Sequence, residues 1–129
     1  MKTKADIVHS WLRKADSDLA NIRACLAAEE AFDTACFHAQ QAAEKVLKAY
    51  LVAHDIEFPF LHNIEKLLEM CAQKDPAFLE FMTIGQEFTP YAVELRYDEE
   101  FWPDRATVTQ ALAGAERIRD FVRARLSGV

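Results

Sequence analysis

The sequence predicts an all-α protein, folded as an antiparallel up-and-down bundle of four to five helices. Apolar residues recur at spacings of three and four along most of the chain, which is the pattern of helices with one buried face. The chain has 129 residues, of which only three are glycine and four proline, so few positions interrupt a helix. Short turns join the predicted helices and make neighbours antiparallel. The length suits one domain, residues 1–129.

The first helix is predicted over residues 4–28, with Trp11 as the aromatic anchor of its buried side. Residues 29–32 form a turn that is long enough only for an antiparallel return into the second helix. The apolar stripe that supports this helix contains Val8, Trp11, Leu12, Ala15, Leu19, Ile22 and Leu26.

Residues 33–54 are predicted to form a long helix with two unlike faces, and Asp33 is placed to cap its start. The apolar face is rich in alanine, so a neighbouring helix can approach it closely. It holds Ala35, Ala39, Ala42, Ala43, Val46 and Tyr50, with Cys36 and Leu47 at its edge. The other face is either a solvated surface or a surface for a ligand or partner. It gathers His38, Gln41, Glu44, Lys45 and Lys48.

Pro59 breaks the helical pattern after residue 54, because it disfavours helix at the preceding residue. The apolar residues Ile56, Phe58 and Phe60 are expected to fold back onto the end of the bundle. Leu61 or His62 leads into a third helix, with His62 or Asn63 near the unsatisfied amides of its first turn. One face of this helix holds Ile64, Leu67, Leu68 and Cys71, and Pro76 begins the next segment.

The last third of the chain predicts a kinked or split fourth helix and a well-marked final helix. The fourth lies within residues 77–97, with Thr89 as a cap before Pro90, and an acidic, aromatic loop follows it. For the final helix, Thr107 and Gln110 fit a capping box and Asp104 is a competing cap. Gly128 is expected to stop this helix. Its core stripe contains Val108, Leu112, Ala115, Ile118, Val122 and Leu126. Its second half is expected to carry a solvated charged face, made by Arg117, Arg119, Arg123 and Arg125 with Glu116 and Asp120.

Composition excludes several classes of protein. The net charge of −6 argues against non-specific coating of nucleic acid but leaves room for a local basic pocket. The three cysteines are far apart, which predicts buried reduced thiols in place of a disulfide framework or zinc site. His9 and His54 lack the convergent partners of a metal site, and no cofactor is predicted. The charged N-terminus and the absence of an apolar run of about 20 residues predict a soluble, cytoplasmic protein without a membrane segment.

Three fragments together resemble a known family. They are the block from His38 to Lys48 (HAQQAAEKVLK), the sequence Leu-His-Asn-Ile at residues 61–64, and Arg96-Tyr97. The pattern resembles the short, stand-alone prokaryotic branch of the HEPN domains (higher eukaryotes and prokaryotes nucleotide-binding), over nearly the whole chain. The resemblance implies an up-and-down helical bundle that commonly dimerises. It also implies pairing with a minimal nucleotidyltransferase, in arrangements that look like toxin-antitoxin pairs.

The ribonuclease branch of that family carries an arginine followed, after four to six residues, by a histidine. After Arg96 those positions hold Phe101, Trp102 and Pro103, none of which can exchange a proton. No other arginine in the sequence precedes a histidine at this spacing. The resemblance therefore favours a protein with little or no catalytic activity.

The candidate ligand-binding residues are polar or aromatic side chains near the family fragments. Arg96 is either a clamp for phosphate or carboxylate, or the partner of Glu99, Glu100 or Glu44 in an ion pair. His62 either binds the ligand or has a structural role, and Tyr97 is expected to form a groove wall. Lys45 and Lys48 offer donors to an anion. The alternative is a dimer seam in which Gln41, Glu44 and Lys45 satisfy one another across a two-fold axis. The complete set is Gln41, Lys45, Lys48, His62, Arg96 and Tyr97.

These observations lead to one main hypothesis and two alternatives. The main hypothesis is a homodimeric HEPN protein that binds a nucleotide or RNA and acts with a minimal nucleotidyltransferase. The first alternative is a ribonuclease toxin with a rearranged site that uses Arg96 and His62. The second is a purely structural helical dimerisation module.

Overall fold

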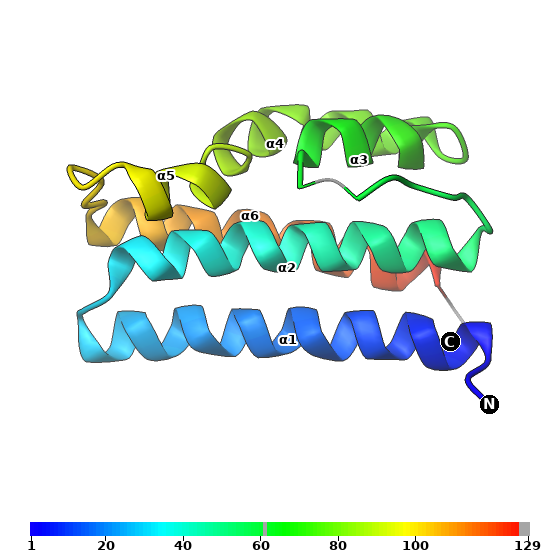
Figure 1. The fold of residues 1–129 in the computed structure, drawn as a ribbon, viewed down its shortest axis with the longest axis horizontal. Helices are drawn as coiled ribbons and strands as arrows, with labels where there is room; N and C mark the ends of the chain where they lie inside the picture. The colour runs from blue at the N-terminus through cyan, green and yellow to red at the C-terminus, as the bar shows by residue number, and fades with distance from the viewer. Residues whose placement is uncertain (61, 127–129) are drawn as a thin grey trace.

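A computed structural model describes residues 1–60 and 62–126, with only the backbone described for residues 94–96. Three long helices run side by side along the molecule, and shorter segments form a layer over them (Figure 1). The all-α fold and the bundle architecture are thus confirmed. In chain order the elements are α1 Lys4–Ala28, α2 Phe32–Ala53, α3 Ile64–Ala72, the 3-10 helix η1 Pro76–Phe81, α4 Met82–Phe88, α5 Tyr91–Tyr97 and α6 Arg105–Arg125.

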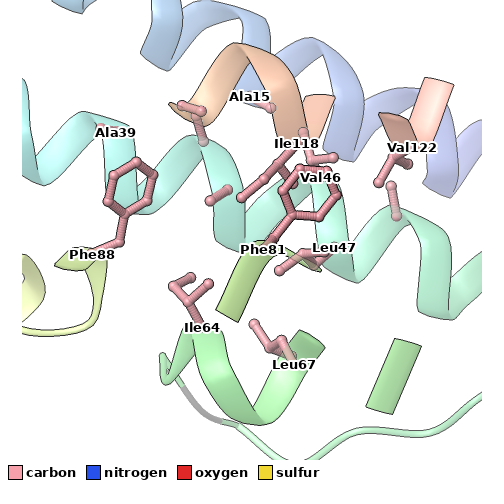
Figure 2. Packing of buried hydrophobic residues seen from close by; sticks show 14 of the residues in the cluster. Ala15, Ala39, Val46, Leu47, Ile64, Leu67, Phe81, Phe88, Ile118 and Val122 are labelled. Carbon is pink, nitrogen blue, oxygen red and sulfur yellow. The ribbon is translucent and has the colours of Figure 1, made fainter. Parts of the chain in front are cut away.

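Helix α2 is the central element of the bundle. It packs against α1, α3, α4, α5 and α6, so nearly all of its surface is covered by protein. Its alanine face is buried as predicted, and the small side chains allow α1 and α6 to come close. Figure 2 shows Val46 and Leu47 of α2 in one apolar cluster with Phe81, Ile118 and Val122.

Helix α1 has the predicted bounds, but the start of α2 differs from the prediction. Thr3 and Asp6 form a capping box at the start of α1. The turn after α1 is very tight, with Glu29 and Ala31 both in the left-handed region at φ 56° and 58°. The reversal is complete one residue early, so α2 starts at Phe32 and has no side-chain cap. The prediction that Asp33 caps α2 is wrong; Asp33 lies in the first turn, where the helix dipole favours its charge.

The segment between α2 and α3 folds back over the bundle, as expected, with one exception. Ile56 and Phe58 pack against the core, and the Ile56 amide donates to the Leu51 carbonyl at 2.9 Å. Phe60 was expected to fold back onto the bundle with them, but it is 90% exposed. Its ring lies instead beside the His62 imidazole, with a centroid separation of 5.0 Å.

Helix α3 is held at its start by two side chains. The Asn63 side chain accepts from the Lys66 amide, as predicted for a cap. The Thr89 hydroxyl accepts from the Ile64 amide at 3.1 Å. Thr89 was predicted to cap the helix that follows it, and this is wrong. It has helical dihedral angles at the end of α4, and its hydroxyl stabilises the start of α3 instead. Leu61 lies outside the described residues.

The predicted splitting of the fourth helix is confirmed, since η1, α4 and α5 occupy residues 76–97. Asp104, and not Thr107, caps α6: its carboxylate accepts from the Thr107 amide at 2.8 Å and from the Thr107 hydroxyl at 2.7 Å. The aspartate carboxylate is thus the cap acceptor, and the threonine serves as its donor. The core stripe of α6 is buried, with Leu112 partly exposed. Gly128, predicted to stop α6, lies outside the described residues.

Two of the three cysteines have the predicted environment, whereas the arginines of α6 contact neighbouring elements and do not form a simply solvated face. Cys36 and Cys71 are buried thiols and Cys25 is half-buried, and burial raises the pKa of the Cys71 thiol to about 12. Arg119 and Arg123 both contact Asp16 of α1, the latter at 2.7 Å. None of the described helices combines the length and apolar character that a bilayer span requires.

Candidate functional site

The polar face of α2 is largely enclosed by the rest of the protein. We define it as His38, Gln41, Glu44, Lys45 and Lys48, together with the side chains that they contact. Helix α1 packs along one flank of α2, and residues 54–60 fold back over the bundle. The side chains of Glu44 and Lys48 are only 5% and 6% exposed. A mainly solvated face, one of the two interpretations left open by the sequence, does not describe them.

One carboxylate from α1 organises the first part of this face. Asp18 accepts from the Lys45 ammonium at 2.7 Å and lies 2.8 Å from Nδ1 of His38. Asp18 is buried, whereas His38 and Lys45 are partly exposed. Two side chains of α2 are therefore fixed by one group of α1. We call these three residues the Asp18 cluster.

A second carboxylate, that of Glu44, organises the rest. One oxygen accepts from the Lys48 ammonium at 3.0 Å. The other lies 2.9 Å from Nδ1 of His62 and accepts from the Gln40 amide at 3.0 Å. Gln40 also donates to the His62 carbonyl at 2.9 Å. We call these four residues the Glu44 cluster; within the described residues, no buried side-chain nitrogen or oxygen lacks a hydrogen-bond partner.

Gln40 was missed by the sequence analysis although it is completely buried. A signal exists in the sequence: helical spacing places Gln40 between the apolar residues Cys36 and Leu47 and the polar residue Glu44, at the border of the two faces. A buried amide needs partners for both of its ends. Here the Gln40 nitrogen donates to the Glu44 carboxylate and to the His62 carbonyl, and its oxygen accepts from Gln41.

Aromatic rings surround the ammonium of Lys48. Trp11, Phe58 and Phe60 place their ring centroids 5.7, 5.7 and 5.8 Å from its Nζ atom. These distances allow cation–π attraction, which is strengthened where water is excluded. Trp11 is thus only partly the core anchor that its position predicted, since its ring also faces a buried cation. Lys48 is directed into the protein and not toward open solvent.

A small pocket opens beside the Glu44 cluster. It has a volume of about 150 Å³ and is lined by Phe37 and Gln41 of α2, His62 of the α2–α3 connection and Ala92 of α5. Gln41 is held by a hydrogen bond from its Nε2 to Oε1 of Gln40 at 2.7 Å. The pocket therefore brings together two side chains, Gln41 and His62, that the sequence selected from segments far apart in the chain.

The other predicted site residues lie around this pocket in different ways. Lys45 belongs to the Asp18 cluster and Lys48 to the Glu44 cluster, so separate carboxylates hold them. Tyr97, at the end of α5, is 80% exposed and does not line the pocket. The backbone of Arg96 follows Ala92 by about one turn of α5; its side chain lies outside the described residues. Glu44 and Lys45 have partners within one chain, so neither requires a second copy to form its hydrogen bonds.

Across the described part of the chain, no group of three or more His, Cys, Asp or Glu side chains is placed to hold an ion. What the site offers is hydrogen-bonding atoms with fixed directions: each of its two imidazoles has Nδ1 beside a carboxylate and Nε2 turned away from it.

Comparison with known proteins gives a consistent result. The model of the HEPN domain matches residues 8–125. The crystal structure of ST0689, an archaeal HEPN homologue, is 24% identical, with a TM-score of 0.75 over 97% of this chain and 98% of that one. The crystal structure of TT1696 from Thermus thermophilus is 25% identical, with a TM-score of 0.81 over 92% and 98%. No curated protein matched the chain.

The Glu44 cluster leads to a stability prediction. The variant Glu44→Gln leaves the Lys48 ammonium buried without a counter-charge, and we expect it to lower the free energy of unfolding by about 3 kcal/mol. The double variant Glu44→Gln/Lys48→Met replaces the ion pair with neutral groups and is expected to recover most of that loss. Urea unfolding measures both.

Glu69→Gln on the exposed side of α3 is the matched control, and it should change the free energy of unfolding by no more than about 0.5 kcal/mol. A single variant Glu44→Gln as stable as the wild type would contradict the account of the cluster.

Proposed function

Because the chain belongs to the HEPN family, we propose that it is a homodimeric protein that binds a nucleotide or RNA and acts with a minimal nucleotidyltransferase in a toxin-antitoxin-like pair. One observation carries the ligand-binding part of this proposal. Gln41 and His62 line a common pocket, and neighbouring side chains fix the direction of each. A preorganised set of polar atoms loses little conformational entropy when a ligand binds.

Each proposed ligand-binding residue has a distinct part. Gln41 and His62 contact the ligand from the pocket wall. Lys45 adds positive charge at the edge of the polar face, and Lys48 acts indirectly by holding the carboxylate that orients His62. Arg96, in α5, supplies a planar guanidinium that can grip a phosphate with two parallel bonds. The exposed ring of Tyr97 provides further contact at the end of the same helix.

Exposed apolar side chains support an association with other proteins. Val93 and Tyr97 of α5 and Trp102 of the following loop are 57%, 80% and 75% exposed. Val93 and Tyr97 are four residues apart and share one face of α5, and a contiguous exposed apolar patch is typical of a surface that a partner covers. A second copy of the chain and a nucleotidyltransferase are the partners that the family resemblance implies. Phe101, Trp102 and Pro103 stand where a ribonuclease histidine would follow Arg96, so the binding role requires no catalysis by this chain.

Ligand binding is tested by thermal shift with ATP and with single-stranded RNA. At about 100 times the Kd, a ligand that binds only the folded state stabilises it by about 2.7 kcal/mol, which raises Tm by several degrees. Arg96→Ala and Lys45→Ala should weaken binding about tenfold or more, because each removes a charged donor. Lys74→Ala, an exposed lysine beyond the end of α3, serves as the control and should bind as the wild type does.

An unchanged Tm with both ligands would remove the binding function. It would leave the structural dimerisation module as the remaining interpretation.

The Glu44–His62 pair supports a second candidate function, that of a ribonuclease with a rearranged site. A carboxylate on Nδ1 orients an imidazole and holds the proton of the neutral ring on that atom, which leaves Nε2 to accept a proton. In RNA cleavage, Nε2 of His62 would take the proton of the 2′-hydroxyl as its oxygen attacks the adjacent phosphorus. The bond from phosphorus to the 5′-oxygen of the next nucleotide would break, and that oxygen would leave with a proton from water, giving a 2′,3′-cyclic phosphate and a free 5′-hydroxyl. Arg96 would stabilise the charge on the phosphate.

This candidate is tested by incubating the protein with a cellular RNA and following cleavage on gels. If His62 is the base, both His62→Ala and Arg96→Ala should abolish the products. His9→Ala, at an exposed position of α1, should cleave normally. Intact RNA with the wild-type protein, or cleavage that survives His62→Ala, would reject the ribonuclease.

A further inference from the structure

The pocket is too small for a complete nucleotide. Its volume of about 150 Å³ is below the roughly 300 Å³ at which pockets for drug-sized ligands begin. It suits one planar ring, with sugar and phosphate remaining outside. Ala92 contributes only a methyl group to the lining, and this small side chain keeps the space open.

Phe37 gives the pocket an aromatic wall. This residue is partly buried in α2, and the neighbouring His38 ring stands at 69° to it, with the centroids 5.8 Å apart. That edge contact restrains the orientation of the phenyl ring. Aromatic side chains of this kind stack with bases of single-stranded nucleic acids, largely independently of sequence.

The amide of Gln41 has a defined orientation. Its Nε2 donates to Oε1 of Gln40, whose own Nε2 is used by Glu44 and by the His62 carbonyl. The oxygen of Gln40 must therefore face Gln41, and the nitrogen of Gln41 must face that oxygen. This leaves Oε1 of Gln41 and its second N–H, for which the described residues show no further partner.

His62 presents an acceptor. The Glu44 carboxylate can only accept, so the imidazole carries its proton on Nδ1, where the two residues meet. In the neutral ring, Nε2 then has a lone pair. The side chain is 49% exposed and lines the pocket.

The pocket thus offers two acceptors, Oε1 of Gln41 and Nε2 of His62, and one donor, the free N–H of Gln41. Adenine, cytosine and guanine each carry an exocyclic amino group with two N–H donors, together with an acceptor on the ring. Uracil has no amino group and only one ring N–H that is free in RNA. We infer that the pocket binds one base of single-stranded RNA and prefers bases with an exocyclic amino group.

The strand must be single because a base in a duplex has its edge paired and its faces stacked. This inference rests on the proposed RNA binding and adds the base pocket, its preference and the role of Phe37.

Fluorescence anisotropy with labelled oligoadenylate, oligocytidylate and oligouridylate of equal length tests the inference. Cytosine and uracil have the same ring size, so their comparison isolates the amino group. We expect oligocytidylate to bind about tenfold more tightly than oligouridylate. Gln41→Leu should reduce that difference, because it removes one acceptor and the donor. Unlabelled cytidine monophosphate should compete much less well than the oligonucleotide.

Ala92→Phe tests the cavity itself, since the larger side chain fills it without removing a polar group. It should weaken binding of all the oligonucleotides about tenfold or more. Leu79→Phe introduces the same side chain at an exposed position of η1, outside the pocket lining, and should bind as the wild type does. If circular dichroism shows Ala92→Phe to be unfolded, Phe37→Leu replaces it, with the same expected loss.

The outcomes distinguish failure of the base pocket from failure of RNA binding itself. Equal binding of oligocytidylate and oligouridylate, or wild-type binding by a folded Ala92→Phe, would overturn the base pocket and leave RNA binding in place. Competition by cytidine monophosphate as strong as that by the oligonucleotide would overturn the requirement for a strand. No binding of any oligonucleotide would overturn both the inference and the proposed RNA binding.

Discussion

The buried carboxylate of Glu44 is the group on which the candidate site depends. A carboxylate removed from water is stable only when charges and donors surround it, and here Lys48, His62 and Gln40 supply them. These three partners come from the same helix and from the turn before α3. The Glu44 cluster therefore ties the segment before α3 to α2. His62 is held in its position because the buried carboxylate needs a donor there.

Lys48 links the Glu44 cluster to α1 as well. Its ammonium contacts Glu44 and is enclosed by rings from α1 and from the α2–α3 connection. Asp18 forms an equivalent link between α1 and α2 through Lys45 and His38. The polar face of α2 is thus an ordered layer between elements, and its exposed edge carries the atoms available to a ligand. The same residues stabilise the bundle and prepare the pocket.

The sequence predicted the parts of the fold that depend on local patterns. Apolar spacing located the helices and their buried faces, and the cap residues Asn63 and Asp104 were among those anticipated. Errors arose where a tight turn, or a contact with a residue distant in the sequence, determines the structure. The tight turn at Ala31 displaced the start of α2 away from Asp33, the Thr89 hydroxyl went to α3, and Phe60 covers a cation and not the apolar core. Periodicity cannot show such contacts.

The candidate site was predictable to a similar degree. The polar face of α2 and His62 were recognised from residue type and spacing, and two of the selected residues meet in one pocket. The pairing of Lys45 with Asp18 joins residues 27 positions apart, so spacing within one helix could not reveal it. Gln40 was overlooked because it lies beside the polar stripe and reaches the site only through Gln41, Glu44 and His62. Phe37 was overlooked because an apolar side chain gives no polar signal, although it lines the pocket itself.

Nitrogen-15 NMR of the imidazole rings tests the central claim most directly, namely that buried carboxylates fix both histidines through Nδ1. At alkaline pH, long-range correlation spectra distinguish the two neutral tautomers. The account predicts a protonated Nδ1 and an unprotonated Nε2 for both His62 and His38, with exposed His9 as the reference ring. A protonated Nε2 and a bare Nδ1 in His62 would contradict it, because that ring could not donate to Glu44.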